Sequence, residues 1–262
     1  MRPAVALTIA GSDSGGGAGI QADLKTFAAL GVHGTCALTA VTAQSTRGVR
    51  AFVELPLDIV RAQVDEVVAD LEPDATKTGM LASAGIIRVV AAAVAELRIA
   101  NLVVDPVMVA KGGARLLHED AVDALRRDLL PMAAVLTPNL PEAEVLLDRR
   151  IASREERERA AIDLVALGCR AAVVKGGHAE GDADDVVFDG RQVTWLSGTR
   201  MQTRSTHGSG CAFSAAITAG LALGRALPDA LREAKAFIAG AIEHGLDLGA
   251  GHGPVDPTWR WR

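Results

Sequence analysis

The sequence predicts an α/β fold in which helices cover both faces of a mostly parallel sheet. Short apolar or β-branched runs alternate with longer segments of helical spacing along most of the 262 residues. Most of the short runs are apolar on both sides, which is typical of parallel strands buried between two layers of helices. Glycine is abundant, with 27 residues, and aromatic residues make up only 3% of the chain. That composition favours close backbone packing over large aromatic clusters.

Six strands are expected in the first two thirds of the chain, each bounded by helix or turn signals. The first apolar run is short and runs into Gly11 and Asp13, which indicates a strand rather than a signal peptide. The predicted strands are Val5–Ile9, Cys36–Ala43, Thr76–Thr78, Leu102–Val104, Ala134–Leu136 and Ala172–Val174.

Helices are predicted between these strands. Within the third predicted helix, Ile87, Val90 and Val94 lie at three- and four-residue spacing and form one apolar stripe. Gly31 and Gly168 stand where two of the helices would end. The predicted helices are Ile20–Leu30, Asp58–Asp70, Ser83–Leu97, Glu119–Leu129, Pro141–Leu147 and Glu155–Leu167.

The pattern changes near residue 184. Residues 185–195 predict a β-hairpin around the turn Asp189-Gly190. Two helices follow, at Gly210–Leu223 and Pro228–Leu246. Because no linker, repeat or low-complexity tract interrupts the chain, we expect one domain over residues 1–262. In such a fold, ligands bind at the carboxyl ends of the parallel strands.

Charge and cysteine content exclude several classes of protein. The net charge is −5, and the densest arginine cluster, at residues 149–159, is interleaved with glutamates. That is typical of a solvated helix face and not of a nucleic-acid patch. No stretch approaches the roughly 20 apolar residues of a membrane span. Cys36, Cys169 and Cys211 are widely spaced, which favours free thiols in the cytoplasm.

The most informative segment is the Gly-rich turn Thr206–Cys211, which opens directly into an Ala-rich helix. Unpaired N–H groups at a helix start attract anions, and a thiol there usually has a lowered pKa. The segment therefore suits phosphoryl transfer, with Cys211 as a proton acceptor. The alternative is a helix capped by Thr206 or Ser209, and the segment alone does not decide between them.

A second Gly-rich segment follows the first predicted strand. It contains Gly17, Gly19 and Ala22 at the spacing of a weak dinucleotide fingerprint. No acidic residue clearly ends the next strand near position 40, so NAD binding is disfavoured. Asp23 either favours the helix dipole or directs a carboxylate at an amine or hydroxyl of a ligand.

Other strand ends also carry polar residues, and several of these have both a structural and a functional interpretation. Gln44 is an ordinary loop residue or a donor and acceptor for a heteroaromatic ring. Asp105 is a candidate carboxylate on the metal side, and Lys111–Gly113 a candidate lid. Asn139 and Glu142 either form a helix cap or orient hydrated Mg²⁺.

Several motifs are absent. There is no GxxxxGK[ST] sequence, which excludes a P-loop kinase, and there is no GxSxG or HExxH. The six histidines are isolated in the sequence and are expected mostly on the surface or in loops.

Seven segments, taken together in order and spacing, resemble the ribokinase-like kinases. Within them the chain is similar to the hydroxymethylpyrimidine/phosphomethylpyrimidine kinases of thiamine biosynthesis, and the similarity covers nearly all of the sequence. The resemblance implies a three-layer fold with a mostly parallel central sheet. The segments are Leu7–Asp13, Gly16–Thr26, Lys77–Leu81, Asp105–Met108, Thr137–Glu142, Val174–His178 and Thr206–Cys211.

The resemblance also implies roles for single residues. Asp23 and Gln44 would hydrogen-bond an aminopyrimidine, and Gly11, Met80 and Val107 would frame its ring. The remaining implied roles concern ATP, Mg²⁺ and the transferred phosphoryl group. They fall to Asp105 and Glu142 (metal), Asn139, Lys175, Thr206 and Lys235 (nucleotide), Gly208, Ser209 and Gly210 (anion hole, with Lys175), and Cys211 (base).

The activity implied is ATP-dependent phosphorylation of 4-amino-5-hydroxymethyl-2-methylpyrimidine, and then of its monophosphate. Relatives are often dimers, so a homodimer is also implied. Alternatives are a sugar kinase or a pyridoxal kinase on the same fold, a dehydrogenase, or a non-catalytic pyrimidine-binding regulator. Sugar kinases of this fold mostly carry Asp where this chain has Cys211. Relatives that also take pyridoxal often carry a second Cys where this chain has Ala110.

Overall fold

A nine-stranded sheet forms the middle layer of the computed structural model, which describes residues 2–110, 112–118, 120–179 and 181–262. The strand order is β3-β2-β1-β4-β5-β6-β7-β8-β9. Strands β2 to β7 of this order run parallel, and β3, β8 and β9 are antiparallel additions at the two edges. The strands are β1 Val5–Asp13, β2 His33–Ser45, β3 Gly48–Glu54, β4 Ala75–Thr78, β5 Leu102–Val104, β6 Val135–Leu136, β7 Ala172–Val174, β8 Asp185–Phe188 and β9 Val193–Leu196.

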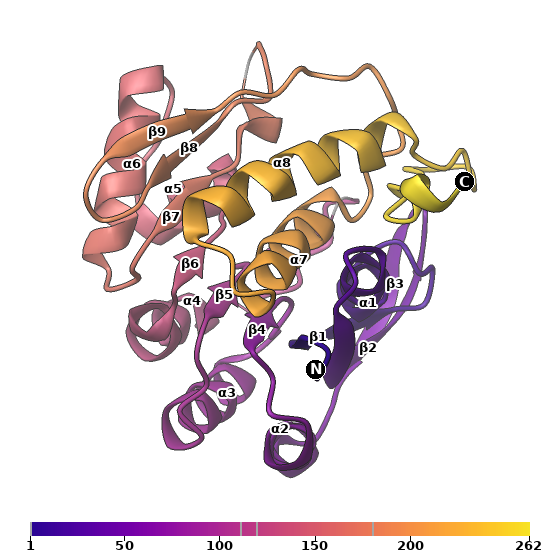
Figure 1. The fold of residues 1–262 in the computed structure, drawn as a ribbon, viewed down its shortest axis with the longest axis vertical. Helices are drawn as coiled ribbons and strands as arrows, with labels where there is room; N and C mark the ends of the chain where they lie inside the picture. Colours follow the sequence, from indigo (N-terminus) through magenta and orange to yellow (C-terminus); the bar gives the residue numbers. More distant parts are fainter. Residues whose placement is uncertain (1, 111, 119, 180) are drawn as a thin grey trace.

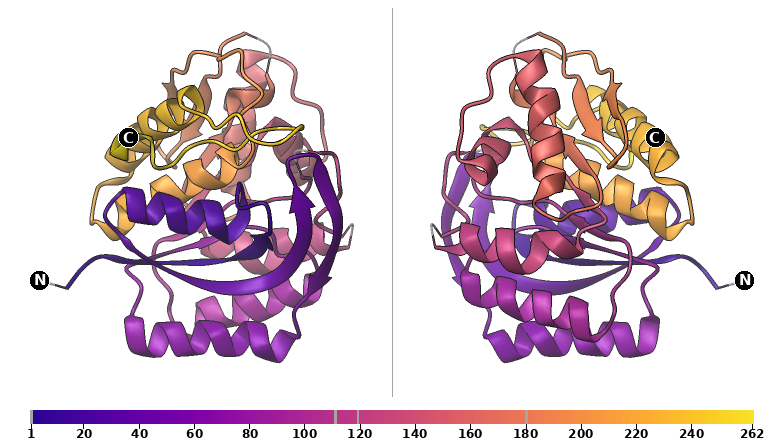
Figure 2. Two further views of the ribbon diagram at one scale, coloured as in Figure 1. Left: turned by 90° about the vertical axis from the view of Figure 1, so that its right-hand side faces the viewer. Right: turned by 90° about the vertical axis from the view of Figure 1, so that its left-hand side faces the viewer.

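Helices cover both faces of this sheet, as Figures 1 and 2 show. α1, α7 and α8 lie on one face, and α2, α3, α4, α5 and α6 on the other. The predicted α/β class and three-layer arrangement are therefore confirmed. The helices are α1 Gly19–Ala29, α2 Leu57–Leu71, α3 Ala84–Glu96, α4 Ala121–Ala124, α5 Leu140–Leu147, α6 Arg154–Ala166, α7 Ser209–Ala222 and α8 Leu227–Glu243.

Strand β5 shows why the short runs are apolar on both sides. Leu102 and Val104 pack into the core under α2, α3 and α6. Val103, between them, points to the opposite face and packs against Phe213 and Phe237 of α7 and α8. Successive side chains of a strand alternate in direction, so both must be apolar when helices cover both faces.

Two elements differ from the prediction. Strand β3 is not among the predicted strands, because the apolar residues of this exposed edge strand, Val49, Ala51, Phe52 and Val53, do not alternate regularly with polar ones; Val53 is 68% exposed. The helix predicted at Glu119–Leu129 begins at Ala121 in the described chain and becomes a π-helical turn at Leu125–Leu129. Pro131 follows in a 3-10 turn and has no N–H group to continue the helix. Glu119 itself lies outside the described residues.

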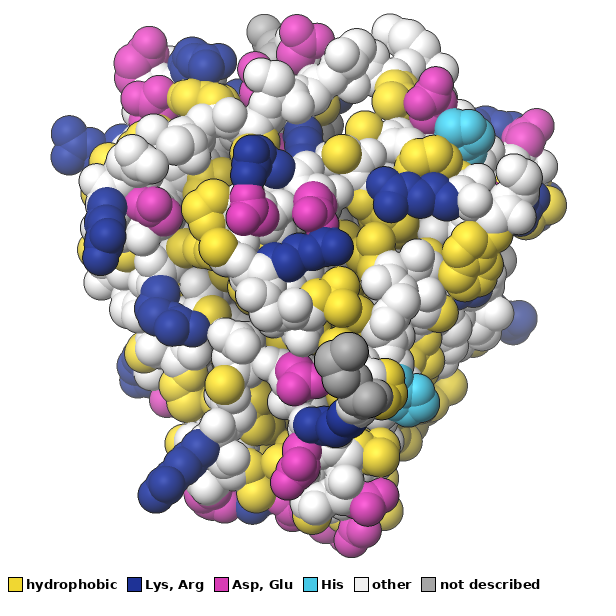
Figure 3. Space-filling view, viewed as in Figure 1, with side chains coloured by type: hydrophobic (Ala, Val, Ile, Leu, Met, Phe, Trp, Pro, Cys, Tyr) yellow, Lys and Arg dark blue, Asp and Glu magenta, His cyan; other side chains and the backbone are white. Residues whose placement is uncertain are grey.

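The chain places several loop segments at one edge of the sheet. The parallel strands β1, β4, β5, β6 and β7 all end there, and the N-terminus of α7 arrives at the same edge (Figure 1). Charged side chains of both signs are interspersed over the face seen in Figure 3. Within the described ranges, no helix combines the length and apolarity that a membrane crossing requires.

Candidate functional site

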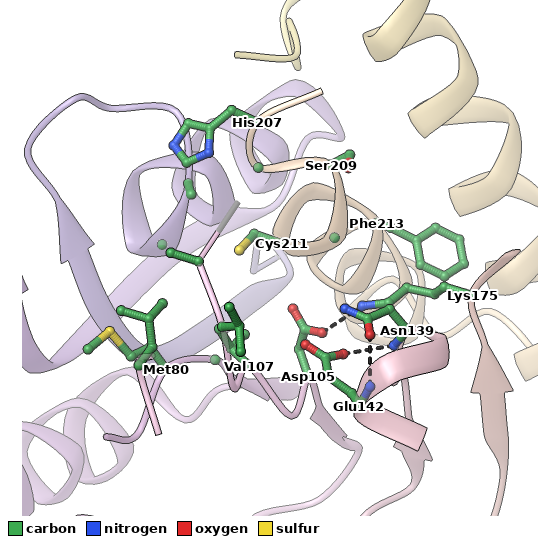
Figure 4. Close-up of a pocket in the computed structure, with 18 of the residues that line it drawn as sticks. Met80, Asp105, Val107, Asn139, Glu142, Lys175, His207, Ser209, Cys211 and Phe213 are labelled. Atoms are coloured by element: carbon green, nitrogen blue, oxygen red, sulfur yellow. Dashed lines mark hydrogen bonds and ion pairs between the residues drawn. The ribbon is translucent and has the colours of Figure 1, made fainter. Parts of the chain in front are cut away.

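A cavity of about 580 Å³ opens at the carboxyl ends of the parallel strands. Its volume lies in the range of sites for small molecules. The cavity brings together residues that are distant in the sequence (Figure 4). With the exception of Asp23, all of the predicted site residues line it: Gly11, Gln44, Met80, Asp105, Val107, Asn139, Glu142, Lys175, Thr206, Gly208, Ser209, Gly210, Cys211 and Lys235.

The turn before α7 has the conformation of an anion-binding loop. Gly208 is the N-cap residue, with a φ of 77°, and no side chain caps the helix. A Cβ atom on Gly208 would lie 1.8 Å from the carbonyl oxygen of Gly17, so this position accepts only glycine. The capping alternative for Thr206 or Ser209 is therefore wrong. The N–H of Ser209 donates to the carbonyl of Thr206 at 3.3 Å, so the N–H groups of Gly210 and Cys211 are the ones that this helix start offers to a ligand in the cavity.

Cys211 lies in that first turn, but its thiol is not activated as expected. Burial raises the pKa of Cys211 to about 12, and the carboxylates of Asp23 and Asp105 add to the shift. The ammonium of Lys77 and the N–H of Gly19 lower it by less. The expected lowering at a helix start is thus outweighed by the loss of hydration and by two nearby negative charges.

Beside the turn, Lys175 and Asp105 form a buried ion pair. Lys175 Nζ lies 2.9 Å from Asp105 Oδ1, and the Ser214 hydroxyl donates to Asp105 Oδ2 at 3.2 Å. Burial opposes the charge of Asp105, but Lys175 and Lys77 hold its pKa below the usual value. A Cβ atom on Gly210 would lie 3.3 Å from Lys175 Nζ. The ammonium therefore stands next to the backbone of the anion-binding turn.

Asn139 and Glu142 form the predicted capping box at the start of α5. Asn139 Oδ1 accepts the Glu142 N–H at 2.9 Å, and Glu142 Oε2 accepts the Asn139 N–H at 2.7 Å. The predicted helix cap is confirmed, and because both residues also line the cavity, the role in binding Mg²⁺ stays a prediction that the cap does not exclude. Burial raises the pKa of Glu142 to about 7, with Lys175 acting against the shift.

Asp105 and Glu142, the two carboxylates predicted to bind the metal, both line the cavity. Among the described residues, no group of three or more His, Cys, Asp or Glu side chains is arranged to hold a metal ion. Mg²⁺ is usually held by one or two carboxylates together with water and substrate phosphates. The donor set therefore fits Mg²⁺ bound largely through a nucleotide.

Asp23 does not reach the cavity, which corrects the expected contact with a pyrimidine ring. Its carboxylate is completely buried, 3.1 Å from Lys77 Nζ and 2.7 Å from the Thr8 hydroxyl. Its other oxygen, Oδ1, has no hydrogen-bond partner within the described structure. Lys77 does line the cavity. Asp23 thus acts on the site through its ion pair with Lys77 and through its charge near Cys211.

The opposite wall of the cavity is apolar. A Cβ atom on Gly11 would lie 3.0 Å from Met80 Sδ, so Gly11 leaves room for the methionine. Met80 and Val107 belong to one small apolar cluster. Gln44 also lines the cavity, and its side-chain amide lies 3.2 Å from the Thr42 hydroxyl. This apolar part of the cavity is suited to a ring of low polarity.

The predicted contact of Lys235 with the nucleotide stays a prediction. Lys235 lines the cavity, but its ammonium donates to Asp185 Oδ2 at 2.7 Å and to the carbonyl of Ala183 at 2.6 Å. In the proposed lid, Lys111 lies outside the described residues, and Gly113 has a φ of 84°.

Sequence reasoning assigned no role to several polar residues of this cavity, among them Lys77, Asp13 and His207. Lys77 carried a usable signal, because a lysine in an otherwise uncharged parallel strand must find a buried partner. Asp13 ends β1, as Asp105 follows β5. His207 was expected to be a loop residue, but it is buried.

Comparisons with known proteins find similarity to small-molecule kinases over nearly the whole chain. A family model described as phosphomethylpyrimidine kinase matches residues 13–256. A hydroxymethylpyrimidine/phosphomethylpyrimidine kinase of Streptomyces coelicolor is 50% identical over 259 residues, covering 99% of this chain and 96% of that protein. A thiamine biosynthesis bifunctional protein of Geobacter sulfurreducens is 49% identical, covering 95% of this chain and 51% of that protein. The ADP complex of Bacillus subtilis pyridoxal kinase superposes with a TM-score of 0.93 at 39% identity, covering 99% of both chains.

Proposed function

Since the chain belongs to the phosphomethylpyrimidine kinase family, we propose that it phosphorylates 4-amino-5-hydroxymethyl-2-methylpyrimidine with ATP, and then phosphorylates the monophosphate to the diphosphate. The product serves thiamine biosynthesis. One observation carries the proposal: an anion-binding turn, a buried lysine and two carboxylates share one cavity with an apolar slot for a ring.

Each part has a role in phosphoryl transfer, which depends on positioning and charge neutralisation. The N–H groups of Gly210 and Cys211 stabilise negative charge on the transferred group. The ammonium of Lys175 neutralises the same charge from the side. Met80 and Val107 hold the ring so that its hydroxymethyl group faces the turn.

Bound Mg²⁺ would be held by Asp105 and Glu142 on the nucleotide side and would neutralise phosphate charge. Glu142 is protonated in part near pH 7, because burial raises its pKa to about 7. A cation beside it favours the ionised form. Glu142 therefore binds a cation more readily as the pH rises from 6 to 8.

Pyridoxal is the second candidate acceptor, since a pyridoxal kinase superposes closely on this chain. It also has a flat heteroaromatic ring with a hydroxymethyl group. Ala110 stands where relatives that take pyridoxal often carry Cys, which favours the pyrimidine as the better substrate.

The setting of the enzyme is part of the same proposal. We infer one kinase domain over residues 1–262, a homodimer by analogy with relatives, and a cytoplasmic location without nucleic-acid or membrane partners. The three cysteines are free thiols, as a reducing compartment favours. Size-exclusion chromatography with light scattering tests the dimer.

The deciding experiment is release of ADP, measured side by side with the hydroxymethylpyrimidine, its phosphate, pyridoxal and ribose. Turnover is expected with both pyrimidines and weaker turnover with pyridoxal. Turnover only with ribose or pyridoxal would refute the proposed acceptor. Binding of the pyrimidine without ADP release would identify a regulator instead, and a change of NADH fluorescence would identify a dehydrogenase.

A further inference from the structure

Two residues that lack an assigned role, Asp13 and His207, form a buried pair in the lining of the cavity. His207 Nε2 lies 2.8 Å from Asp13 Oδ2, and their side chains are 10% and 3% exposed. Asp13 ends β1, while His207 precedes Gly208. The pair therefore joins the loop before α1 to the anion-binding turn before α7.

Asp13 also organises its own loop. Its Oδ1 accepts the N–H of Gly15 at 2.8 Å, and its Oδ2 accepts the N–H groups of Gly17 at 3.1 Å and Ala18 at 2.8 Å. A carboxylate that accepts these three bonds is an acceptor only, so Nε2 of His207 must donate. Asp13 thus holds the Gly-rich loop and His207 with one side chain.

The backbone of the turn is held from the other side. The N–H of His207 donates to the carbonyl of Gly253 at 2.9 Å, and the N–H of Val255 donates to the carbonyl of His207 at 3.1 Å. A Cβ atom on Gly17 would lie 2.4 Å from His207 Cδ2. The C-terminal segment therefore holds the backbone of the turn, and the loop backbone at Gly17 lies against the imidazole.

The same pair also constrains Gln44. The side-chain nitrogen of Gln44 is placed 3.4 Å from His207 Nε2, and its oxygen 3.2 Å from Thr42 Oγ1. Nε2 already donates to Asp13, and the Thr42 hydroxyl donates to the carbonyl of Ser12 at 2.9 Å. Every donor finds an acceptor only when the Gln44 oxygen faces His207 and its nitrogen faces Thr42.

From this geometry we propose that Asp13 and His207 are positioning residues for two subsites, the one that binds the transferred phosphoryl group and the one that binds the acceptor ring. The pair fastens the anion-binding turn to the loop after β1, and it fixes the orientation of the Gln44 side-chain amide in the cavity lining. This inference rests on the proposed function, because it concerns the phosphoryl and ring subsites of that reaction.

The test compares His207→Leu with His207→Gln. Leucine keeps the bulk of the side chain but cannot donate to Asp13, whereas glutamine can. His207→Leu is expected to lower kcat for both phosphorylations about 10- to 100-fold, since small displacements of reacting groups have such effects. It is also expected to raise the KM of the pyrimidine about tenfold, and His207→Gln is expected to restore most of both losses.

Exposed His252, on the neighbouring C-terminal segment, supplies the matched control His252→Leu, which should leave kcat and KM unchanged. Urea unfolding of each variant separates positioning from loss of fold. A double-mutant cycle with Asp13→Asn adds a second readout: if the pair acts as a unit, the double variant loses no more activity than the worse single variant.

The inference fails if His207→Leu has wild-type kinetic constants, if glutamine restores nothing, or if the two single losses add. Failure of the proposed function appears instead in the wild type, as no ADP release with either pyrimidine. Calorimetric titration of ADP then still tests the turn, with weaker binding expected for His207→Leu and equal binding contradicting the inference.

Discussion

At the scale of single residues, the floor of the cavity holds charged side chains that are almost fully buried. Lys77 and Asp23 are paired below it, and Lys175 and Asp105 are paired beside it. Replacing a buried ion pair by apolar residues often improves stability. Their presence under one cavity is therefore explained better by the electrostatics of a bound anion than by stability.

Replacing Cys211 tests its role as a base. If the thiolate accepts the alcohol proton, Cys211→Ala should slow the first phosphorylation about 100-fold or more, because base catalysis contributes that much. The second step should change far less, since its acceptor is already an anion. Single-turnover measurements on each substrate give the two rates.

The pH dependence of the same step is a further check. Burial raises the pKa of Cys211 to about 12, so the thiolate fraction rises throughout pH 7 to 9. The first-step rate of the wild type should rise over that range, and Cys211→Ala should lack the rise. Cys36→Ala, on β2, serves as the control. Equal losses in both steps would refute the base role.

Lys77→Met should destabilise the protein by about 3–5 kcal/mol, because it leaves the Asp23 carboxylate buried without a counter-charge. The double variant with Asp23→Leu should regain much of that loss. Urea unfolding measures both. Lys25→Met, which removes an exposed ammonium, is the control and should cost about 1 kcal/mol or less. A small effect for Lys77→Met would contradict the buried pair.

At the scale of elements, glycines and caps set how each loop meets the cavity. Gly31 and Gly168 have φ angles of 76° and 116° just after α1 and α6, as their positions in the sequence predict. The capping box at α5 was predicted as well. The turn before α7 differs, because its geometry depends on Gly17, which is distant in the sequence.

Gly208→Ala should therefore lower kcat at least about 100-fold, because the added methyl group collides with the carbonyl of Gly17 and displaces the turn. Gly224→Ala is a matched control at the other end of α7. Its φ is 75°, but no atom lies within 4 Å of the added group. Both variants carry the cost of a positive φ, about 1–2 kcal/mol. Equal activity of the two would contradict the anion-binding role.

At the scale of the whole molecule, function depends on the order of the sheet. The strand order brings the ends of β1, β4, β5, β6 and β7 to one edge, and α7 returns there from the last third of the chain. The buried ionisable groups at this edge have different pKa values in the folded and unfolded states. The free energy of unfolding therefore depends on pH.

The stability of the protein without nucleotide and Mg²⁺ should fall as the pH rises from about 4.5 to 7. Burial raises the pKa of Glu142 from 4.5 to about 7, so the folded state holds more protons than the unfolded state in that window. Urea unfolding of Glu142→Gln should lack this loss, which amounts to about 3 kcal/mol at most. Glutamine can still accept the N–H of Asn139. A parallel pH profile for both proteins would contradict the raised pKa.

The acid side of the profile has the opposite sign. The pKa values of Asp13 and Asp105 lie below 3.8, because hydrogen bonds and nearby cations outweigh burial. Their stabilisation is complete above the unfolded value and is lost as the pH falls through the folded one. Unfolding free energy should therefore also drop below about pH 4.

The sequence by itself determined the fold class, most strands and helices, and a set of site residues nearly all of which line the cavity. Local signals suffice for these features: apolar runs on both faces, helical spacing, glycine after a helix, and polar residues just after a strand. Strand β3 was not predicted because its apolar residues do not alternate regularly with polar ones, and an exposed edge strand does not require that they do.

Only the tertiary structure decided which polar groups are partners. It placed Asp23 beneath the cavity with Lys77, raised rather than lowered the pKa of Cys211, and joined Asp13 to His207 across 194 positions. Partners and burial depend on how distant segments pack, and hydration is lost only when they do. The sequence therefore fixes which groups are available, while packing fixes their charge and their orientation.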